Sequence, residues 1–132
     1  MPSVDDIMTT TVRTMHRGTL VHEVKSMFVE HKISGAPLVD DLGHLVGFVS
    51  KSDIIRFDSD DGDPNCVRAY EIGTPKVISI APSAPVEEAA QKMVLERVDH
   101  LVVMKNETMA GILSQFDFVK IVAETPGRGE IQ

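Results

Sequence analysis

The chain has 132 residues, of which 42% are hydrophobic and 25% charged, as expected for one globular domain or two small ones. Its formal net charge of −7 argues against non-specific binding of nucleic acid, whose phosphates it would repel. No apolar run approaches the roughly 18 residues of a membrane span, so we expect no membrane segment. The single cysteine can form no internal disulfide, and the start lacks a signal-peptide pattern. We therefore expect a cytoplasmic protein.

In chain order, the first half predicts a strand, a helix, a hairpin and a second helix. Thr19 is the expected N-cap of the first helix, in which apolar residues recur at helical spacing. Asp40-Asp41-Leu42-Gly43 is typical of a hairpin turn. The expected elements are a strand over 12–15, a helix over 20–32, hairpin strands over 36–39 and 45–49, and a helix over 52–57.

The second half predicts the same elements in the same order. Ser83 is the expected N-cap of its first helix, and the polar, turn-rich stretch 58–65 predicts an exposed linker between the halves. The remaining elements are a strand over 76–80, hairpin strands over 100–104 and 109–113, and a last helix over 116–123.

The two halves also share a sequence repeat. Gly47-Phe48-Val49-Ser50-Lys51-Ser52-Asp53 returns 64 positions later as Gly111-Ile112-Leu113-Ser114-Gln115-Phe116-Asp117. A period this long exceeds that of most solenoid repeats and indicates a duplicated small domain.

These features together resemble a tandem pair of CBS domains, the module named after cystathionine β-synthase. The resemblance covers residues 5–123 and rests on an ordered set of segments: Asp6-Ile7-Met8-Thr9, His31-Lys32-Ile33, Gly35 to Asp40, Gly47 to Asp53, Arg97 to Val103, and Gly111 to Asp117. It implies an α+β fold of two pseudo-symmetric β-α-β-β-α motifs packed through their sheets. The implied boundaries are motif 1 over 5–58, a linker over 59–69, motif 2 over 70–123, and a flexible tail over 124–132.

Paired CBS domains commonly bind adenosine-containing ligands in two clefts, so the resemblance implies AMP, ADP, ATP or an S-adenosylmethionine-type ligand. No cofactor is required, and no metal or catalytic residue is implied. The family signature Gly-x-x-Ser/Thr-x-x-Asp is intact in both copies. Asp53 and Asp117 would accept hydrogen bonds from the ribose 2′ and 3′ hydroxyls, while Ser50 and Ser114 would contact ribose or phosphate.

The same Ser-x-x-Asp residues also fit a purely structural helix cap, because they match the capping-box pattern. Both roles can coexist. The resemblance further implies that each cleft takes walls from both halves. Around Ser50 and Asp53 it expects Val77, Ile78, Val98, Asp99 and His100; around Ser114 and Asp117 it expects Arg13, Ile33, Ser34 and Gly35. His100 would give the cleft around Asp53 a potential cation. Its counterpart in the other cleft, Gly35, has no side chain and can provide none.

The leading functional hypothesis is a ligand-sensing regulatory module that acts through self-association or an unidentified protein partner. A homodimer is expected, with Val24, Phe28, Met93, Val94 and the stretch 118–122 as candidate contacts. The alternative is a structural dimerisation module with vestigial clefts. A third reading, a small nucleotide hydrolase, lacks any activated nucleophile with its base, so we expect no enzyme activity.

Overall fold

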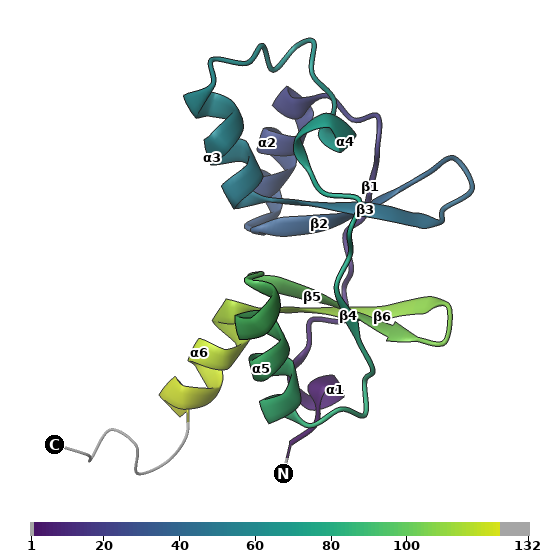
Figure 1. Cartoon of the computed structure of the whole chain (residues 1–132), viewed down its shortest axis with the longest axis vertical. Helices are drawn as coiled ribbons and strands as arrows, with labels where there is room; N and C mark the ends of the chain where they lie inside the picture. The colour runs from purple at the N-terminus through teal and green to yellow at the C-terminus, as the bar shows by residue number, and fades with distance from the viewer. Residues whose placement is uncertain (1, 125–132) are drawn as a thin grey trace, which may run out of the picture. The chain divides into compact units, whose positions relative to one another are not determined.

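The computed structural model describes residues 2–124, which fold into two compact units (Figure 1). The inserted unit is the continuous segment Arg13–Val77, and the terminal unit joins Met1–Val12 to Ile78–Gln132. The predicted tail lies, from residue 125 on, outside the described residues. In the described part of the chain, no helix is both long and apolar enough to cross a bilayer.

The inserted unit is a three-stranded sheet with helices packed on it. Its elements are β1 (Met15–His16), α2 (Val21–His31), β2 (Gly35–Val39), β3 (Leu45–Ser50), α3 (Lys51–Ser59) and α4 (Ala69–Ile72). β1 pairs parallel and β3 antiparallel with the central strand β2. The predicted turn between β2 and β3 is confirmed, because the Asp40 side chain accepts from the Leu42 and His44 backbone N–H groups and Gly43 has a φ of +82°.

The terminal unit repeats this plan. Its elements are α1 (Val4–Ile7), β4 (Ser79–Ile80), α5 (Val86–Glu96), β5 (His100–Lys105), β6 (Thr108–Ser114) and α6 (Gln115–Glu124). The sheet order is β4-β5-β6, again with one parallel and one antiparallel pair. The predicted α+β fold of two matching motifs is therefore confirmed, and each unit has a core cluster of its own.

The short first helix of each sequence repeat packs in the unit formed by the other repeat. Val4 of α1 is fully buried in the core of the terminal unit, and its backbone N–H donates to Ala84 O at 2.9 Å. Ala69 of α4 is fully buried in the inserted unit and donates to Thr19 O at 2.7 Å. The compact units therefore differ from the linear repeats that the sequence shows.

The exchanged segments also cap the long helices. Val21 and His22, at the start of α2, donate their backbone N–H groups to Val67 O and Pro64 O at 2.9 and 3.0 Å. The N-caps are Leu20 and Pro85, so the predictions of Thr19 and Ser83 were wrong. The strands predicted over 12–15 and 76–80 are also shorter than expected, at two residues each.

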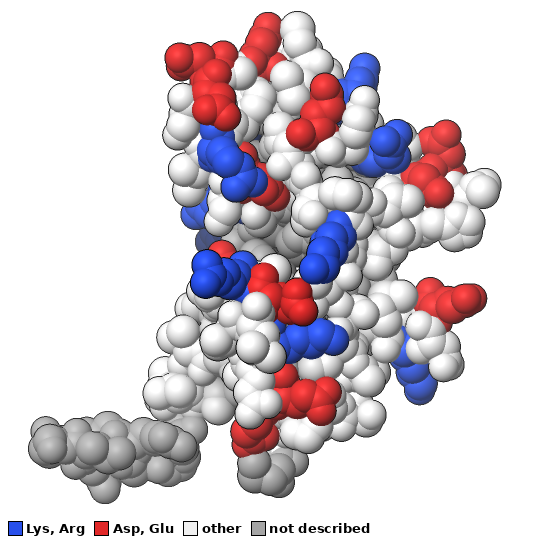
Figure 2. Space-filling model, viewed as in Figure 1, with Lys and Arg blue, Asp and Glu red and all other residues white. Residues whose placement is uncertain are grey.

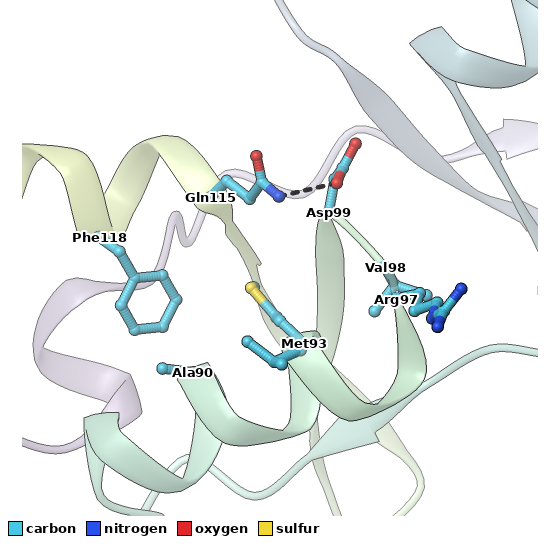
Figure 3. A pocket seen from close by; sticks show the side chains of 8 residues that line it. Ala90, Met93, Arg97, Val98, Asp99, Gln115 and Phe118 are labelled. Atoms are coloured by element: carbon cyan, nitrogen blue, oxygen red, sulfur yellow. Dashed lines mark hydrogen bonds between the residues drawn. The ribbon is translucent and has the colours of Figure 1, made fainter.

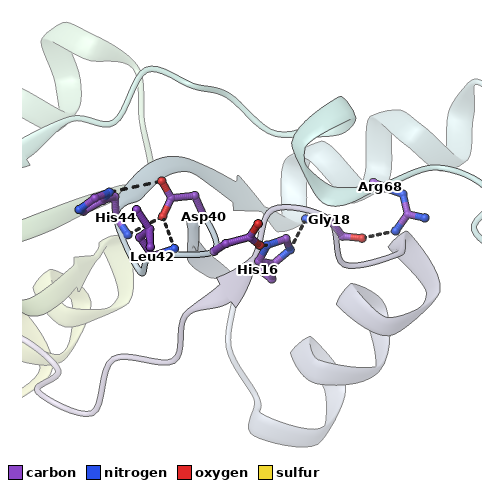
Figure 4. A network of polar contacts seen from close by, with 7 residues as sticks. His16, Gly18, Asp40, Leu42, His44 and Arg68 are labelled. Carbon is purple, nitrogen blue, oxygen red and sulfur yellow. Dashed lines mark hydrogen bonds and ion pairs between the residues drawn. The ribbon is translucent and has the colours of Figure 1, made fainter.

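Polar contacts join the β1–α2 loop to its neighbours in the inserted unit (Figure 4). His16 Nε2 lies 2.6 Å from Asp41 Oδ1 on the hairpin, and its Nδ1 accepts from Gly18 N at 3.0 Å. Arg68 donates to Gly18 O at 2.6 Å, which ties the segment before α4 to the same loop.

Candidate functional site

The first Ser-x-x-Asp sequence forms the junction of β3 and α3. Ser50 is the N-cap of α3 with extended backbone, and Asp53 occupies the third helical position. Asp53 Oδ2 accepts from Ser50 N at 2.8 Å and from Ser50 Oγ at 3.1 Å, while Asp53 N donates to Ser50 Oγ at 3.3 Å. The structural reading as a capping box is therefore confirmed for this copy.

The second Ser-x-x-Asp sequence joins β6 to α6, and its serine donates to the aspartate as in the first copy. Asp117 Oδ2 accepts from Ser114 N at 2.8 Å and from Ser114 Oγ at 3.3 Å. Asp117 is only 5% exposed, and it is the one buried charged residue among those that the structure describes. The carboxylate of Asp117 is therefore both buried and held in one orientation by the backbone of Ser114.

The glycine of each signature makes room for backbone. Phe48 bridges to Thr74, and a Cβ built on Gly47 would lie 2.8 Å from Thr74 O. The equivalent Ile112 bridges to Thr9, and a Cβ on Gly111 would lie 2.8 Å from Thr9 O. The segment that follows each exchanged helix therefore packs directly against the site strand, which accounts for the glycine without any contact to a ligand.

In the inserted unit, the predicted residues Ile33, Ser34 and Gly35 lie beside Ser50. Gly35 pairs with Ser50 in the sheet, and Ser34 O accepts from Lys51 N at 2.8 Å. Ile33 packs against the core of this unit. Arg13 and Val77 are the first and last residues of the unit.

In the terminal unit, Val98, Asp99 and His100 lie beside Ser114. His100 pairs with Ser114 in the sheet, and Gln115 donates from its backbone N and its Nε2 to Asp99 O and Oδ1, at 3.0 and 2.9 Å. Ile78 accepts from Val102 N at 3.0 Å and packs on the core. In each unit, the loop that precedes the hairpin therefore lies next to the Ser-x-x-Asp sequence of the same unit. The assignment of walls from the opposite half stays a prediction.

A pocket of about 480 Å³ lies between α5 and α6 of the terminal unit (Figure 3). Its lining residues are Ala90, Met93, Val94, Arg97, Val98, Asp99, Gln115 and Phe118. The volume is within the range typical of small-molecule sites. Val98 and Asp99 are among the site residues predicted from the sequence. Arg97 and Gln115 were not predicted, because they come together at the pocket only when the chain is folded.

His100 has a lowered pKa. Burial disfavours its charged form, although the nearby Asp99 and Asp117 carboxylates oppose the effect. The sequence-based expectation of a cation at this position therefore applies only at a lower pH than for an ordinary histidine.

The lowered pKa of His100 predicts a pH-dependent stability. Because the folded pKa lies below the unfolded value of about 6.5, the unfolded state binds more protons as the pH falls, and the free energy of unfolding decreases. His100→Gln should remove this component, so its stability should fall less than that of the parent. Urea unfolding at about pH 7.5 and about pH 5.5 measures the difference. His22→Gln, an exposed histidine on α2, is the matched control, and parallel losses in the parent and His100→Gln would contradict the prediction.

Comparison with known proteins identifies the family. The CBS domain family model matches residues 4–60 and 69–124. The chain therefore belongs to the CBS domain family.

A homoserine O-acetyltransferase from Methanohalobium evestigatum is 30% identical over 122 residues, which is 92% of this chain. The chain spans 24% of the length of that enzyme and less than half of a second relative. The match thus covers only a part of the enzyme.

Solved structures that are similar to the chain include two CBS proteins. The CBS domain pair of protein MJ0100, in complex with 5′-methylthioadenosine and S-adenosyl-L-methionine, has a TM-score of 0.85 and 25% identity, covering 93% of this chain and 97% of its own. The hexameric CBS-CP12 protein from bloom-forming cyanobacteria has a TM-score of 0.85 and 25% identity, covering 96% and 77%.

Proposed function

We propose that this chain is a regulatory module that binds adenosine-containing ligands at its two Ser-x-x-Asp sites. The observation that carries the proposal is the buried carboxylate of Asp117, held through Oδ2 by the Ser114 backbone. Its other oxygen, Oδ1, faces Lys120 Nζ at 3.9 Å, a distance that is too long for a hydrogen bond. Oδ1 can therefore accept from a ligand hydroxyl.

The proposed ligand group is the ribose of an adenosine. A carboxylate fixed in orientation can accept hydrogen bonds from two neighbouring hydroxyls, and charge-assisted bonds of this kind are the stronger ones. The positive dipole end at the start of α6 favours an anion such as a phosphate nearby. The similarity to the MJ0100 pair, which is bound to two adenosine derivatives, supports this ligand class.

The charge distribution also fits a small ligand better than nucleic acid. Figure 2 shows acidic and basic side chains interspersed on the visible face, without a continuous basic surface. Non-specific nucleic-acid binding depends on such a surface.

Native mass spectrometry tests the proposed function directly. The protein is mixed with adenosine, AMP, ATP, 5′-methylthioadenosine or S-adenosylmethionine, and with guanosine as the control. We expect one or two adenosine ligands per chain, bound with their masses intact, and no guanosine. A shortened ligand mass would instead indicate hydrolysis. Binding of no adenosine compound at millimolar concentration would overturn the proposal and favour the structural dimerisation module.

Self-association is the second part of the proposed function. Several apolar side chains on α5 and α6 are more than half exposed: Val94, Leu95, Phe116, Val119 and Val122. Val94 also lines the pocket between these helices. Among the contacts expected from the sequence, Val24, Phe28 and Met93 are instead buried in their own units. We therefore propose that a second copy covers the α5–α6 surface, as in an isologous dimer.

A lysine at Val94 is expected to weaken the dimer. Burying an unpaired ammonium in an apolar contact is costly, so the dimer dissociation constant should rise more than about tenfold. Leu42→Lys, which adds the same charge at an equally exposed hairpin position, is the matched control. Sedimentation equilibrium measures both variants, and a monomeric parent at every micromolar concentration would contradict the homodimer.

A further inference from the structure

A basic residue follows each signature aspartate by three positions. Arg56 follows Asp53, and Lys120 follows Asp117 at the equivalent place in the second copy. Three residues along a helix places two side chains on the same face, so each cation can reach its aspartate. The spacing alone is the same in the two copies and does not distinguish them.

The two pairs differ in geometry. Arg56 Nη2 donates to Asp53 Oδ1 at 2.5 Å, whereas Lys120 Nζ stays 3.9 Å from Asp117 Oδ1. In both copies the other oxygen, Oδ2, is already held by the backbone of the N-cap serine. Both oxygens of Asp53 are therefore engaged within the chain, while Asp117 keeps Oδ1 without a close donor among the described residues.

This difference matters for a ligand with two hydroxyls. Each carboxylate oxygen has two lone pairs, so Arg56 does not block Oδ1 completely. It does occupy a direction from which a ribose hydroxyl could donate, and it partly neutralises the carboxylate charge. A ligand hydroxyl at Asp53 must displace the Arg56 guanidinium or share the carboxylate with it, which weakens its binding. A ligand at Asp117 has no such competitor in hydrogen-bond contact with Oδ1.

We propose that Arg56 is an internal competitor for the ribose-binding carboxylate of Asp53, so that adenosine ligands fill the Ser114–Asp117 site before the Ser50–Asp53 site. This inference rests on the proposed function. The side chain of Arg56 is 66% exposed, and exposed ion pairs contribute only about 0.2–1 kcal/mol. The competition therefore changes affinity by a few-fold and is weakened by salt.

The test isolates each site and uses adenosine, which carries no charge that either cation could contact. Asp117→Asn leaves the Ser50–Asp53 site and keeps a side-chain oxygen for the helix cap. In that background, Arg56→Gln should tighten adenosine binding by roughly 1.4- to 5-fold. Asp53→Asn leaves the other site, and Lys120→Gln in that background is the matched control, expected to change affinity less.

Salt gives a second readout by calorimetry. Adenosine affinity at the Ser50–Asp53 site should rise with salt while Arg56 is present and should be insensitive to salt in Arg56→Gln. The Asp117→Asn protein can also bind adenosine too weakly to measure. In that case, recovery of binding when Arg56→Gln is added supports the competition, and no recovery overturns it.

Further outcomes would also overturn the inference. Unchanged adenosine affinity in Arg56→Gln means that the ion pair does not compete, and weaker affinity means that Arg56 is a ligand contact. In both cases Asp53→Asn still abolishes binding at its site, and the proposed function stands. Binding that survives both asparagine substitutions together would instead remove the proposed function, and the inference with it.

Discussion

Asp117→Ala is expected to weaken adenosine binding at its site by about 10- to 150-fold. Hydrogen bonds to a charged group contribute about 1.5–3 kcal/mol, and each 1.4 kcal/mol is a tenfold change in affinity. The carboxylate is buried and already oriented by Ser114, so its removal takes away both fixed acceptor oxygens. Asp53→Ala should act in the same direction at the other site, and the double variant should bind no measurable ligand. Calorimetry with adenosine measures each loss.

A helix cap is the competing explanation, and the chain contains a matched control for it. Ser3-x-x-Asp6 at α1 makes the same contact, because Ser3 N donates to Asp6 Oδ2 at 2.8 Å. Asp6→Ala should therefore lower stability by about 1 kcal/mol, as other cap losses do, and leave adenosine affinity unchanged. A 2′-deoxyadenosine ligand should reproduce part of the loss in the parent. Asp117→Ala and Asp53→Ala variants that melt earlier but bind like the parent would reduce both aspartates to caps.

Leu113→Ala is expected to lower the free energy of unfolding by about 2–5 kcal/mol. Leu113 is fully buried on β6 and belongs to the core cluster of the terminal unit, so truncation removes apolar contact and leaves a cavity. Leu42→Ala makes the same chemical change at a side chain that is 80% exposed, and it should stay within about 0.5 kcal/mol of the parent. Urea unfolding measures both. Equal effects of the two substitutions would contradict the assignment of the core.

Periodicity was sufficient to predict the long elements of this fold. The two long helices that follow β1 and β4, and both hairpins, were placed within a few residues, because helical spacing and turn residues are local signals. The four-residue helices α1 and α4 were missed, since four residues carry no period. Leu20 and Pro85 were not foreseen as N-caps. The first N–H groups of these helices donate to backbone carbonyls of the exchanged segments, as Val21 N does to Val67 O, and not to a capping side chain. Such partners are distant in sequence.

The candidate site was predictable in part for the same reason. Ser50 and Asp53 form a local contact that repeats at Ser114 and Asp117, so their pairing followed from spacing alone. The burial of Asp117 depends on how β6 and α6 pack, which spacing does not specify. The unequal distances from Arg56 and Lys120 depend on side-chain conformation and were beyond any pattern in the sequence.

The exchange of first helices also sets an order of events during synthesis. Val4 contacts Ala84, which lies 80 positions later in the chain, so α1 leaves the ribosome long before its partners exist. The inserted unit needs only residues 13–77 and can form while the terminal unit is still incomplete. Before the inserted unit folds, residues 13–77 are a long flexible loop between α1 and β4. Once they are folded, less conformational entropy remains to be lost when α1 packs onto the rest of the terminal unit. We therefore expect the inserted unit to assist the folding of the unit that surrounds it in sequence.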